Sequence, residues 1–160
     1  MKKISVGIAE ARIATAPDTL ISYGFGSCIG IAIIDPHARI GGLAHALLAP
    51  GAGSTQSGNP LKYVDSAIDM VLAKLIEAGC ARGALLAKMA GGAHMFEAVP
   101  REGQANIGAR NAEAARQKLD ALGIPLVAED VGGDYGRTIE FNPGDGTLMV
   151  RSIRRGVKLI

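Results

Sequence analysis

Residues 29–48 have the sequence IGIAIIDPHARIGGLAHALL, in which two apolar stretches are separated by a turn. The apolar and β-branched residues from Ile29 to Ile34 predict a buried strand. Aspartate at the first position and proline at the second predict a turn at Asp35–Ala38. The stretch from Ile40 to Leu48 then predicts the returning strand of a β-hairpin. The rest of the chain therefore has to be arranged around this hairpin.

Further strands are predicted on both sides of the hairpin, where apolar residues alternate with polar ones or gather in short runs between glycine-rich turns. They cover residues 4–8, 11–16, 20–23, 84–89, 125–129, 138–141 and 147–153. Since strands outnumber helices and cluster at both ends of the chain, the predicted fold class is α+β, with mixed β-sheets packed in layers with two main helices.

Two helices are predicted between these strands. Asn59 can cap the first helix, Pro60 suits its first turn, and Gly79 can end it. The second helix is expected from about Ile107 to Leu122, because its apolar residues recur at helical spacing. Both helices therefore have one apolar face that a sheet can cover.

The composition is that of one ordinary globular domain. The 160 residues, 48% hydrophobic and 20% charged, exclude wholesale disorder and predict a single domain over residues 1–160. A net charge of +2 does not indicate a polyanionic partner, and the absence of tryptophan counts against a base-stacking nucleic-acid platform. No apolar run approaches the length of a membrane span, and Glu10 and Arg12 interrupt any signal-peptide core. Two cysteines make no disulfide framework, so we expect a cytoplasmic protein.

The hairpin carries a cysteine and a histidine. Cys28 precedes its first strand and His45 lies in its second. If the turn at Asp35–Ala38 closes a simple hairpin, residues whose numbers add up to 73 face each other, and Cys28 is the cross-strand partner of His45. Their Cβ atoms would then be about 5 Å apart, close enough for a thiol–imidazole hydrogen bond. A β-bulge would shift this register and turn one side chain to the other face.

A thiol beside an imidazole can lose its proton to the ring and react as a thiolate. We therefore predict Cys28 as a nucleophile and His45 as its base. Backbone N–H groups around Gly26 and Ser27 could approach a developing oxyanion, and Ser22 could orient the imidazole or bind the substrate. From these residues alone, a cysteine packed as a small hydrophobe and a structural histidine remain the alternative.

Other polar and exposed candidates have weaker signals. Met95 and Phe96 follow the glycine-rich segment Gly91–Ala93 and could either anchor it in the core or form an exposed contact for a partner. Asn106 and Asn111 are expected to cap the second helix and its adjoining loop. The three histidines and two cysteines show no close metal-ligand spacing, so neither a metal nor a cofactor is expected.

Several segments of the chain are similar to the chemoreceptor glutamine deamidase family, the CheD proteins of bacterial and archaeal chemotaxis. The similarity extends from about Ile4 to Ile153. An ordered set of motifs at family-like spacing is more specific than any single motif. The segments are GFGSC at 24–28, AHALL at 44–48, KYVD at 62–65, GGAHMF at 91–96, NIGARN at 106–111 and AEDVGG at 128–133.

This resemblance implies a cysteine-dependent amidohydrolase that converts selected receptor glutamines to glutamates and releases ammonia. By motif position, Cys28 corresponds to the family's nucleophile and His45 to its base. Ser22 lies where related sequences often have threonine, so the hydroxyl is kept.

The implied partners are the cytoplasmic helices of chemoreceptors and a CheC-type phosphatase, with Met95 and Phe96 as possible contacts. Neither nucleic-acid binding nor membrane insertion is implied. The alternative is a non-catalytic binding partner of a CheC-type phosphatase that tunes adaptation. Hydrolysis of receptor methyl esters is chemically compatible with the same site, whereas a general cysteine peptidase is disfavoured by the extent of the similarity.

Overall fold

Two five-stranded sheets and two α-helices make up the described part of the chain in the computed structural model, which is residues 1–50, 58–95 and 106–160. One sheet, here called the outer sheet, has the order β1 (Lys3–Ser5), β3 (Thr19–Phe25), β8 (Arg137–Phe141), β9 (Leu148–Ser152) and β10 (Gly156–Leu159). The second, called the central sheet, has the order β2 (Ala11–Thr15), β5 (Ile40–Ala46), β4 (Ile29–Asp35), β6 (Leu86–Gly91) and β7 (Leu126–Val131). The helices are α1 (Val64–Glu77) and α2 (Ile107–Ala121), and there are short 3₁₀ turns at Pro60–Lys62 and Arg82–Ala84.

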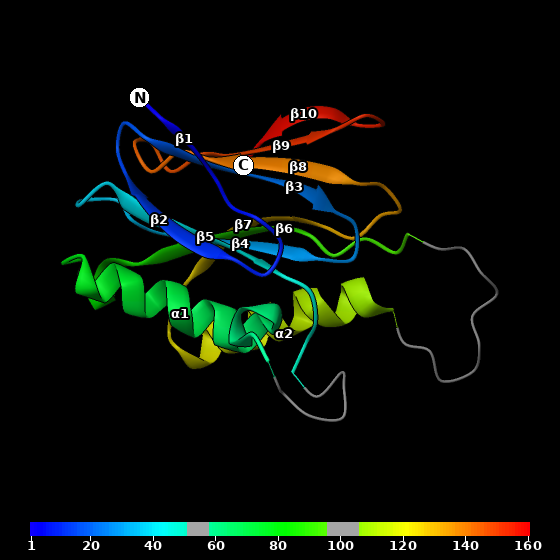
Figure 1. Ribbon diagram of the computed structural model, residues 1–160, viewed down its shortest axis with the longest axis horizontal. Coiled ribbons are helices and arrows are strands. Elements are labelled where there is room, and N and C mark those ends of the chain that lie inside the picture. The colour runs from blue at the N-terminus through cyan, green and yellow to red at the C-terminus, as the bar shows by residue number, and fades with distance from the viewer. Residues whose placement is uncertain (51–57, 96–105) are drawn as a thin grey trace.

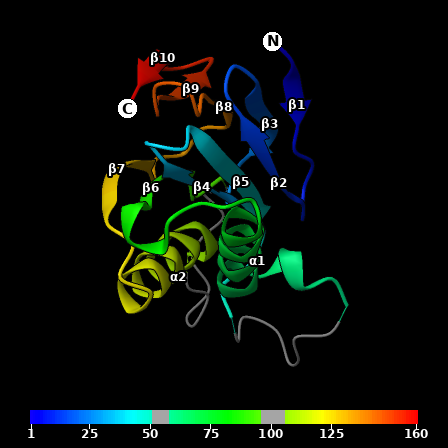
Figure 2. The same ribbon diagram turned by 90° about the vertical axis from the view of Figure 1, so that its left-hand side faces the viewer.

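These elements form three layers (Figures 1 and 2). The central sheet lies between the outer sheet and the two helices, which lie side by side on its other face. β1 pairs with β3 in parallel and β6 with β7 in parallel, whereas the other neighbouring strands are antiparallel, so both sheets are mixed. The predicted α+β class, with layered mixed sheets and two main helices, is confirmed.

β4 contributes to both hydrophobic cores that the described residues form. Ile29, Ile31 and Ile33 pack in the core between the central sheet and the helices, whereas Ala32 and Ile34 pack in the core between the two sheets. Because successive side chains of a strand point to opposite faces, a strand with a core on each face is apolar throughout. Even-numbered positions of β4 therefore face the outer sheet.

The hairpin of β4 and β5 is confirmed, but its predicted register is wrong by two residues. The structure pairs Asp35 with Ile40 and Gly30 with His45. The Asp35 carboxylate accepts hydrogen bonds from the next two N–H groups that follow Pro36, as a turn with aspartate at its first position should. Arg39 then adopts a left-handed conformation with φ of 56° and donates its N–H to the Asp35 carbonyl, so the loop is longer than a simple turn.

α1 begins later than predicted. Asn59 caps the 3₁₀ turn at Pro60–Lys62 by accepting a hydrogen bond from the Leu61 N–H, and Tyr63 is extended, with φ of −102° and ψ of 140°. The helix therefore starts at Val64. Its predicted end is confirmed, because Gly79 follows the last turn with φ of 97°. No helix within the described residues is long and apolar enough to cross a lipid bilayer.

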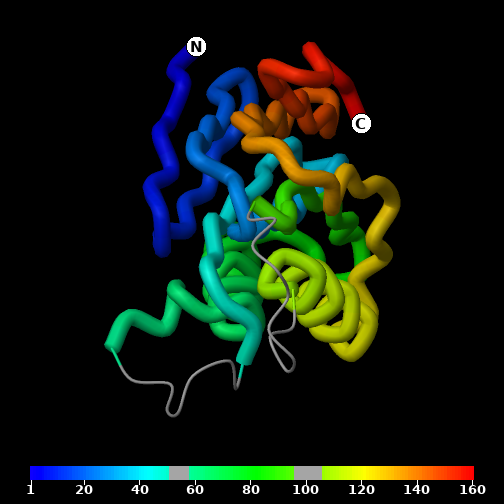
Figure 3. The backbone as a smooth tube through the Cα atoms, turned by 90° about the vertical axis from the view of Figure 1, so that its right-hand side faces the viewer, coloured from blue at the N-terminus to red at the C-terminus, as the bar shows by residue number. Residues whose placement is uncertain are grey.

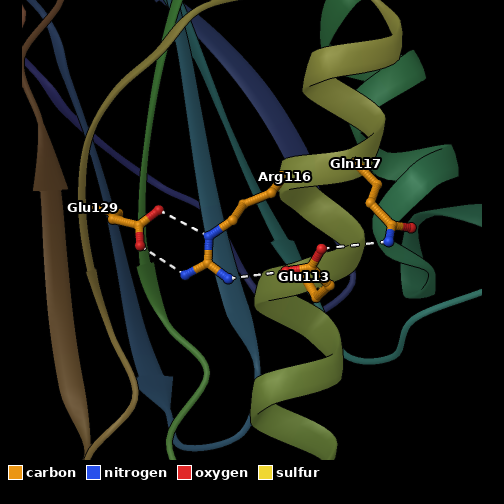
Figure 4. Close-up of polar contacts among 4 residues, drawn as sticks. All are labelled: Glu113, Arg116, Gln117 and Glu129. Carbon is orange, nitrogen blue, oxygen red and sulfur yellow. Dashed lines mark hydrogen bonds and ion pairs between the residues drawn. The ribbon is translucent and has the colours of Figure 1, made fainter.

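An ion pair fastens α2 to the edge strand of the central sheet. Arg116 donates two hydrogen bonds to Glu129 of β7, at 3.1 and 2.7 Å, and a third to Glu113 one turn earlier in the helix (Figure 4). Gln117 contacts the other oxygen of Glu113 at 3.4 Å. The two-pronged geometry fixes the direction of the guanidinium, so it orients the helix on the sheet even though the pair is half-exposed.

Candidate active site

The three residues predicted for catalysis come from neighbouring segments of both sheets. Ser22 lies on β3 of the outer sheet, and His45 lies on β5 of the central sheet. Cys28 lies in the short connection from β3 to β4. This connection turns near the right-hand end of the sheets in Figure 1, and Figure 3 shows the molecule from that side. The site is therefore built where the two sheets face each other.

A bulge in β3 brings two side chains onto its buried face. The register between β3 and β8 shifts between Ser22 and Phe25, and Gly24 has φ of 79°. Ser22 and Phe25 are both buried, whereas Tyr23 and Gly24 between them are exposed. In a regular strand, residues three apart point to opposite faces. The extra residue of the bulge turns Phe25 back to the face that carries Ser22.

The hydroxyl of Ser22 determines which nitrogen of His45 carries the proton. Its Oγ lies 2.9 Å from Nδ1 of His45 and donates a hydrogen bond of 2.5 Å to the carbonyl oxygen of Val6. A hydroxyl has a single proton, and a carbonyl can only accept, so that proton is engaged with Val6. Nδ1 must therefore donate to Ser22, which leaves Nε2 unprotonated. This is the tautomer in which Nε2 can act as a base.

Phe25 covers one face of the imidazole. The two rings are stacked, with centroids 3.9 Å apart and an interplanar angle of 19°. Gly30, opposite His45 on β4, makes room for this arrangement. A Cβ at Gly30 would lie 3.0 Å from ring atoms of Phe25 and 2.4 Å from Cδ1 of Ile139. The absent side chain at Gly30 therefore allows the aromatic ring to pack against the base.

Burial keeps His45 uncharged. The residue is fully buried, and its Nε2 has no hydrogen-bond partner within the described residues. Removal from water disfavours the imidazolium and lowers the pKa of His45 from 6.5 to about 4. At neutral pH the ring is therefore neutral and ready to accept a proton at Nε2.

Cys28 lies on the same face as His45 but is not directly opposite it. Cys28 precedes Gly30 by two residues and packs against the core between the sheets, as an even-numbered position should. Diagonal neighbours of this kind are about 7–8 Å apart. Within the described residues, Nε2 of His45 makes no hydrogen bond, so the thiol does not donate to it in this structure. The expected direct cross-strand pair is therefore replaced by a diagonal one.

The Cys28 thiol is half-buried and protonated at neutral pH. Burial raises its pKa above the ordinary 9.0, and contact with its own backbone N–H offsets this only in part. Neither the Ser27 N–H nor the Cys28 N–H donates to a backbone carbonyl in the described parts of the chain. The sequence predicts oxyanion support around Gly26 and Ser27, and the N–H of Gly26 donates to the Gly24 carbonyl at 3.2 Å. An oxyanion role for the N–H groups of Ser27 and Cys28 stays a prediction.

The end of β6 holds the loop that carries Cys28. The N–H of Gly92 donates to the Cys28 carbonyl at 2.8 Å, and the N–H of Ala93 donates to the Gly26 carbonyl at 2.9 Å. Gly91 has φ of 117°, and a Cβ there would lie 2.4 Å from the Cys28 carbonyl oxygen. Only glycine permits this backbone approach.

Met95 lies beside the same loop. Its side chain is 42% exposed, and its Cγ is 3.0 Å from where a Cβ at Gly26 would be. Met95 therefore packs on the loop and also faces solvent, which combines the two alternatives left open by the sequence. Phe96 lies outside the described residues. A partner-binding role for either residue stays a prediction.

The two asparagines of α2 differ in function. Asn106 caps the helix as expected, because its side chain accepts a hydrogen bond from the Ala109 N–H at 3.0 Å. Asn111 does not cap it. Asn111 is fully buried, and its Nδ2 donates to the carbonyl oxygens of Ser27 and Leu47, each at 2.8 Å. The expectation for Asn111 is therefore wrong.

Three neighbours of the site were missed from the sequence: Val6, Phe25 and Asn111. Asn111 had a signal, since it lies one and two helical turns before the inward-facing Ala115 and Leu119. A polar side chain on that stripe is buried and needs hydrogen-bond partners. Phe25 and Val6 had no comparable signal, because their contacts depend on the bulge and on pairing between distant segments.

The other cysteine and one other histidine lie away from this site. His37 is exposed in the hairpin loop, and Cys80 is buried in the core on the helix side of the central sheet. Among the described residues, no group of three or more His, Cys, Asp or Glu side chains is arranged to hold a metal ion. The chemistry available here is that of a thiol, an imidazole, a hydroxyl and backbone N–H groups.

Comparisons of sequence with known proteins agree in one description. A family model described as CheD chemotactic sensory transduction matches residues 47–152. A "Probable chemoreceptor glutamine deamidase CheD 2" of Geobacter metallireducens is 49% identical over 158 residues, which cover 98% of each chain. A "Chemoreceptor glutamine deamidase CheD" of Halalkalibacterium halodurans is 44% identical over 158 residues, again 98% of each.

A solved structure shares the fold at much lower sequence similarity. The crystal structure of the Neisseria meningitidis protein NMB0706, which is assigned to family DUF152, has a TM-score of 0.51 and 11% sequence identity. The match covers 83% of this chain and 64% of that chain. At this identity the likeness concerns the fold alone.

Proposed function

The chain belongs to the CheD family, and we propose that it is a protein-glutamine deamidase that converts selected glutamine side chains of chemoreceptors to glutamate. The observation that carries the mechanism is the Ser22–His45 hydrogen bond, which leaves Nε2 unprotonated on the face that also carries Cys28. The names of the similar proteins supply the substrate class. The neutral, buried imidazole supplies a base that needs no cofactor.

The first half of the reaction forms a tetrahedral intermediate that carries an oxyanion. Sγ of Cys28 attacks the carbonyl carbon of the glutamine side chain while its proton passes to Nε2 of His45. Because the pKa of His45 is about 4 and that of Cys28 is raised above 9.0, the resting pair is neutral. The proton therefore moves during the attack, and the N–H groups of Ser27 and Cys28 stabilise the oxyanion. Catalytic hydrogen bonds are often long without substrate, so the diagonal spacing is compatible with this step.

The second half releases both products. His45 gives its proton to the departing nitrogen, the C–N bond breaks, and ammonia leaves a glutamyl thioester on Cys28. Water then attacks the thioester carbon and gives a proton to His45, which returns it to the sulfur as glutamate is released. Ser22 accepts from Nδ1 throughout and so stabilises the imidazolium that forms twice in each cycle.

The proposed partners follow from the substrate. Cytoplasmic helices of chemoreceptors would bring their glutamines to the loop that carries Cys28, so the location that goes with this proposal is the cytoplasm. Met95 is a candidate contact, because it is partly exposed beside that loop, and Phe96 is proposed with it from the sequence. A CheC-type phosphatase is a second proposed partner at the same surface. Neither nucleic acid nor membrane insertion has a part in this mechanism.

Mass spectrometry of receptor cytoplasmic fragments tests this function directly. The wild type should convert specific glutamines to glutamates and release ammonia, whereas Cys28→Ala should release none and keep its melting temperature. Cys80→Ala is the matched control, since this cysteine is buried away from the site. Conversion by Cys28→Ala would exclude the thioester mechanism. Absence of conversion by the wild type would instead favour a non-catalytic partner of a CheC-type phosphatase.

A further inference from the structure

The amide of Asn111 joins the two segments that carry the proposed nucleophile and base. Asn111 is fully buried on α2, and its Nδ2 donates to the carbonyl oxygen of Ser27, immediately before Cys28. The same nitrogen donates to the carbonyl oxygen of Leu47, two residues after His45. Both hydrogen bonds are 2.8 Å long. One side chain of a helix therefore contacts both strand ends of the site.

The two acceptors fix the orientation of this amide. Carbonyl oxygens cannot donate, so both protons of the NH₂ group must point toward Ser27 and Leu47. Oδ1 of Asn111 is then left buried with no partner within the described residues. A buried acceptor without a partner costs stability, so packing alone does not favour asparagine here. What asparagine provides at this position is two N–H donors on one nitrogen atom.

Holding the Ser27 carbonyl also sets the direction of the next N–H group. The peptide between Ser27 and Cys28 is planar and trans, so its carbonyl and the Cys28 N–H point in opposite directions. Asn111 pulls the carbonyl toward α2 and therefore turns the Cys28 N–H away from the helix. That N–H has no backbone acceptor among the described residues, as an oxyanion donor should.

The second hydrogen bond ties this peptide to the strand of the base. The paired register of β4 and β5 ends at Ile29 with Ala46, and Asn111 bridges the carbonyls that lie just beyond it. It therefore continues the connection between the strands where their own ladder stops. The Cys28 loop and the end of β5 cannot separate without breaking a buried hydrogen bond.

α2 packs closely against the segment that follows β6. A Cβ at Gly108 would lie 2.3 Å from the Ala93 carbonyl oxygen and 2.4 Å from that of Gly92. Gly92 and Ala93 in turn donate their N–H groups to the loop that carries Cys28. Gly108 is one turn before Asn111, so the helix meets the site at a fixed distance.

We propose that Asn111 is a positioning residue that aims the Cys28 N–H at the oxyanion formed during deamidation. This inference rests on the proposed deamidase function and adds a residue that does not touch the substrate. It gives α2 a role in the reaction, in addition to the roles proposed for Cys28, His45 and Ser22. The role needs two N–H donors on one short side chain, which asparagine supplies and leucine, aspartate or serine does not.

Two reactions of the same thiol separate positioning from general damage. Deamidation forms an oxyanion, whereas alkylation by iodoacetamide forms none and needs only the sulfur. Asn111→Leu, which keeps the branched shape of the side chain and has no donor, should lower kcat for receptor-fragment deamidation roughly 10- to 100-fold, toward the loss expected for an oxyanion donor. KM should stay within about threefold, and the alkylation rate of Cys28 should stay within about twofold of the wild-type rate. Asn111→Ser keeps one donor, so its kcat should lie between those of the wild type and Asn111→Leu.

Asn106→Ala is the matched control on the same helix. It removes the cap of α2 and should lower the melting temperature by roughly 2–4 °C without changing kcat. Wild-type kcat in folded Asn111→Leu would overturn the proposal, as would equal losses of deamidation and alkylation in both Asn111 variants. Failure of the deamidase function itself would show differently, as a wild type that releases no ammonia.

Discussion

Each neighbour of His45 controls a different property of the imidazole ring. Ser22 accepts from Nδ1 and so fixes the tautomer, and Phe25 stacks on the ring and so fixes its plane. Burial lowers the pKa of His45 to about 4. A free histidine in water would be partly charged near neutral pH and would exchange between tautomers. The arrangement therefore produces a base that is uncharged and has its lone pair on one defined nitrogen.

Removal of the Ser22 hydroxyl should lower activity more than stability. Ser22→Ala leaves Nδ1 without its acceptor and frees the ring to adopt the tautomer in which Nε2 is protonated. We expect kcat to fall on the order of 10- to 100-fold, as for other residues that orient a catalytic histidine. Ser22→Thr keeps the hydroxyl and should retain most of the activity. Ammonia release and melting temperature, measured for both variants, separate an effect on activity from an effect on stability. A fully active Ser22→Ala would remove Ser22 from the mechanism.

At the scale of elements, the β4–β5 hairpin could be predicted but its register could not. The apolar run from Ile29 and the Asp35-Pro36 turn are local signals. Arg39 has a positive φ and lengthens the loop. No local sequence pattern predicts this conformation for a residue other than glycine. The resulting shift of two residues is even, so Cys28 stays on the face of His45. A shift of one residue would have separated them.

The parts of the site that could not be predicted depend on contacts between distant segments. The bulge that turns Phe25 toward His45 is a property of the pairing between β3 and β8, which are far apart in the sequence. The delayed start of α1 depends in the same way on Tyr63, which is extended and pairs with Leu48. Asn111 differs, because the helical spacing alone places it on a buried stripe.

A substitution at Gly30 of β4 tests whether the position of the Phe25 ring depends on the missing side chain there. Gly30→Ala puts a methyl group 2.4 Å from Cδ1 of Ile139 and 3.0 Å from Phe25, so the ring must move relative to His45. We expect a loss of about 1–3 kcal/mol in unfolding free energy and lower deamidase activity. Adding Ile139→Val removes the closest atom and should restore part of the stability.

Gly136→Ala is the control for this substitution, since a Cβ at that exposed glycine meets nothing within 4 Å. Its stability should stay within about 0.5 kcal/mol of the wild-type value. Chemical denaturation with a parallel activity assay measures both quantities. Unchanged stability and activity in Gly30→Ala would show that the ring packing does not matter to the site.

At the scale of the whole molecule, the candidate site is part of the packing between the two sheets. Ser22 belongs to the outer sheet and His45 to the central sheet, so their hydrogen bond crosses the interface between the layers. Arg137 on β8 and Asp130 on β7 form a second polar link between the two sheets, at 3.2 Å, with the arginine side chain fully buried. Any change that separates the sheets therefore also removes the base from its partner.

Acid should weaken the whole fold through His45. The unfolded chain takes up a proton at this residue near pH 6.5, whereas the native state resists protonation until about pH 4. The lowered pKa therefore contributes stability that is fully present above pH 6.5 and is lost as pH falls from 6.5 to 4. At 1.36 kcal/mol per pKa unit, the loss is on the order of 3 kcal/mol. Asp35 and Asp145 have pKa values lowered from 3.8, so their contributions are lost mainly below this window.

Urea denaturation at several pH values between 7.5 and 4 isolates this effect. His45→Gln cannot take up the proton, so its unfolding free energy should fall less over the window than that of the wild type, and the two curves should converge toward pH 4. His37→Gln, at an exposed position in the hairpin loop, should follow the wild-type curve. If wild type and His45→Gln instead lose stability in parallel, the imidazole is not held neutral between the sheets. The ring would then titrate near its ordinary pKa of 6.5, and the fraction able to accept the thiol proton would fall as the pH drops through that value.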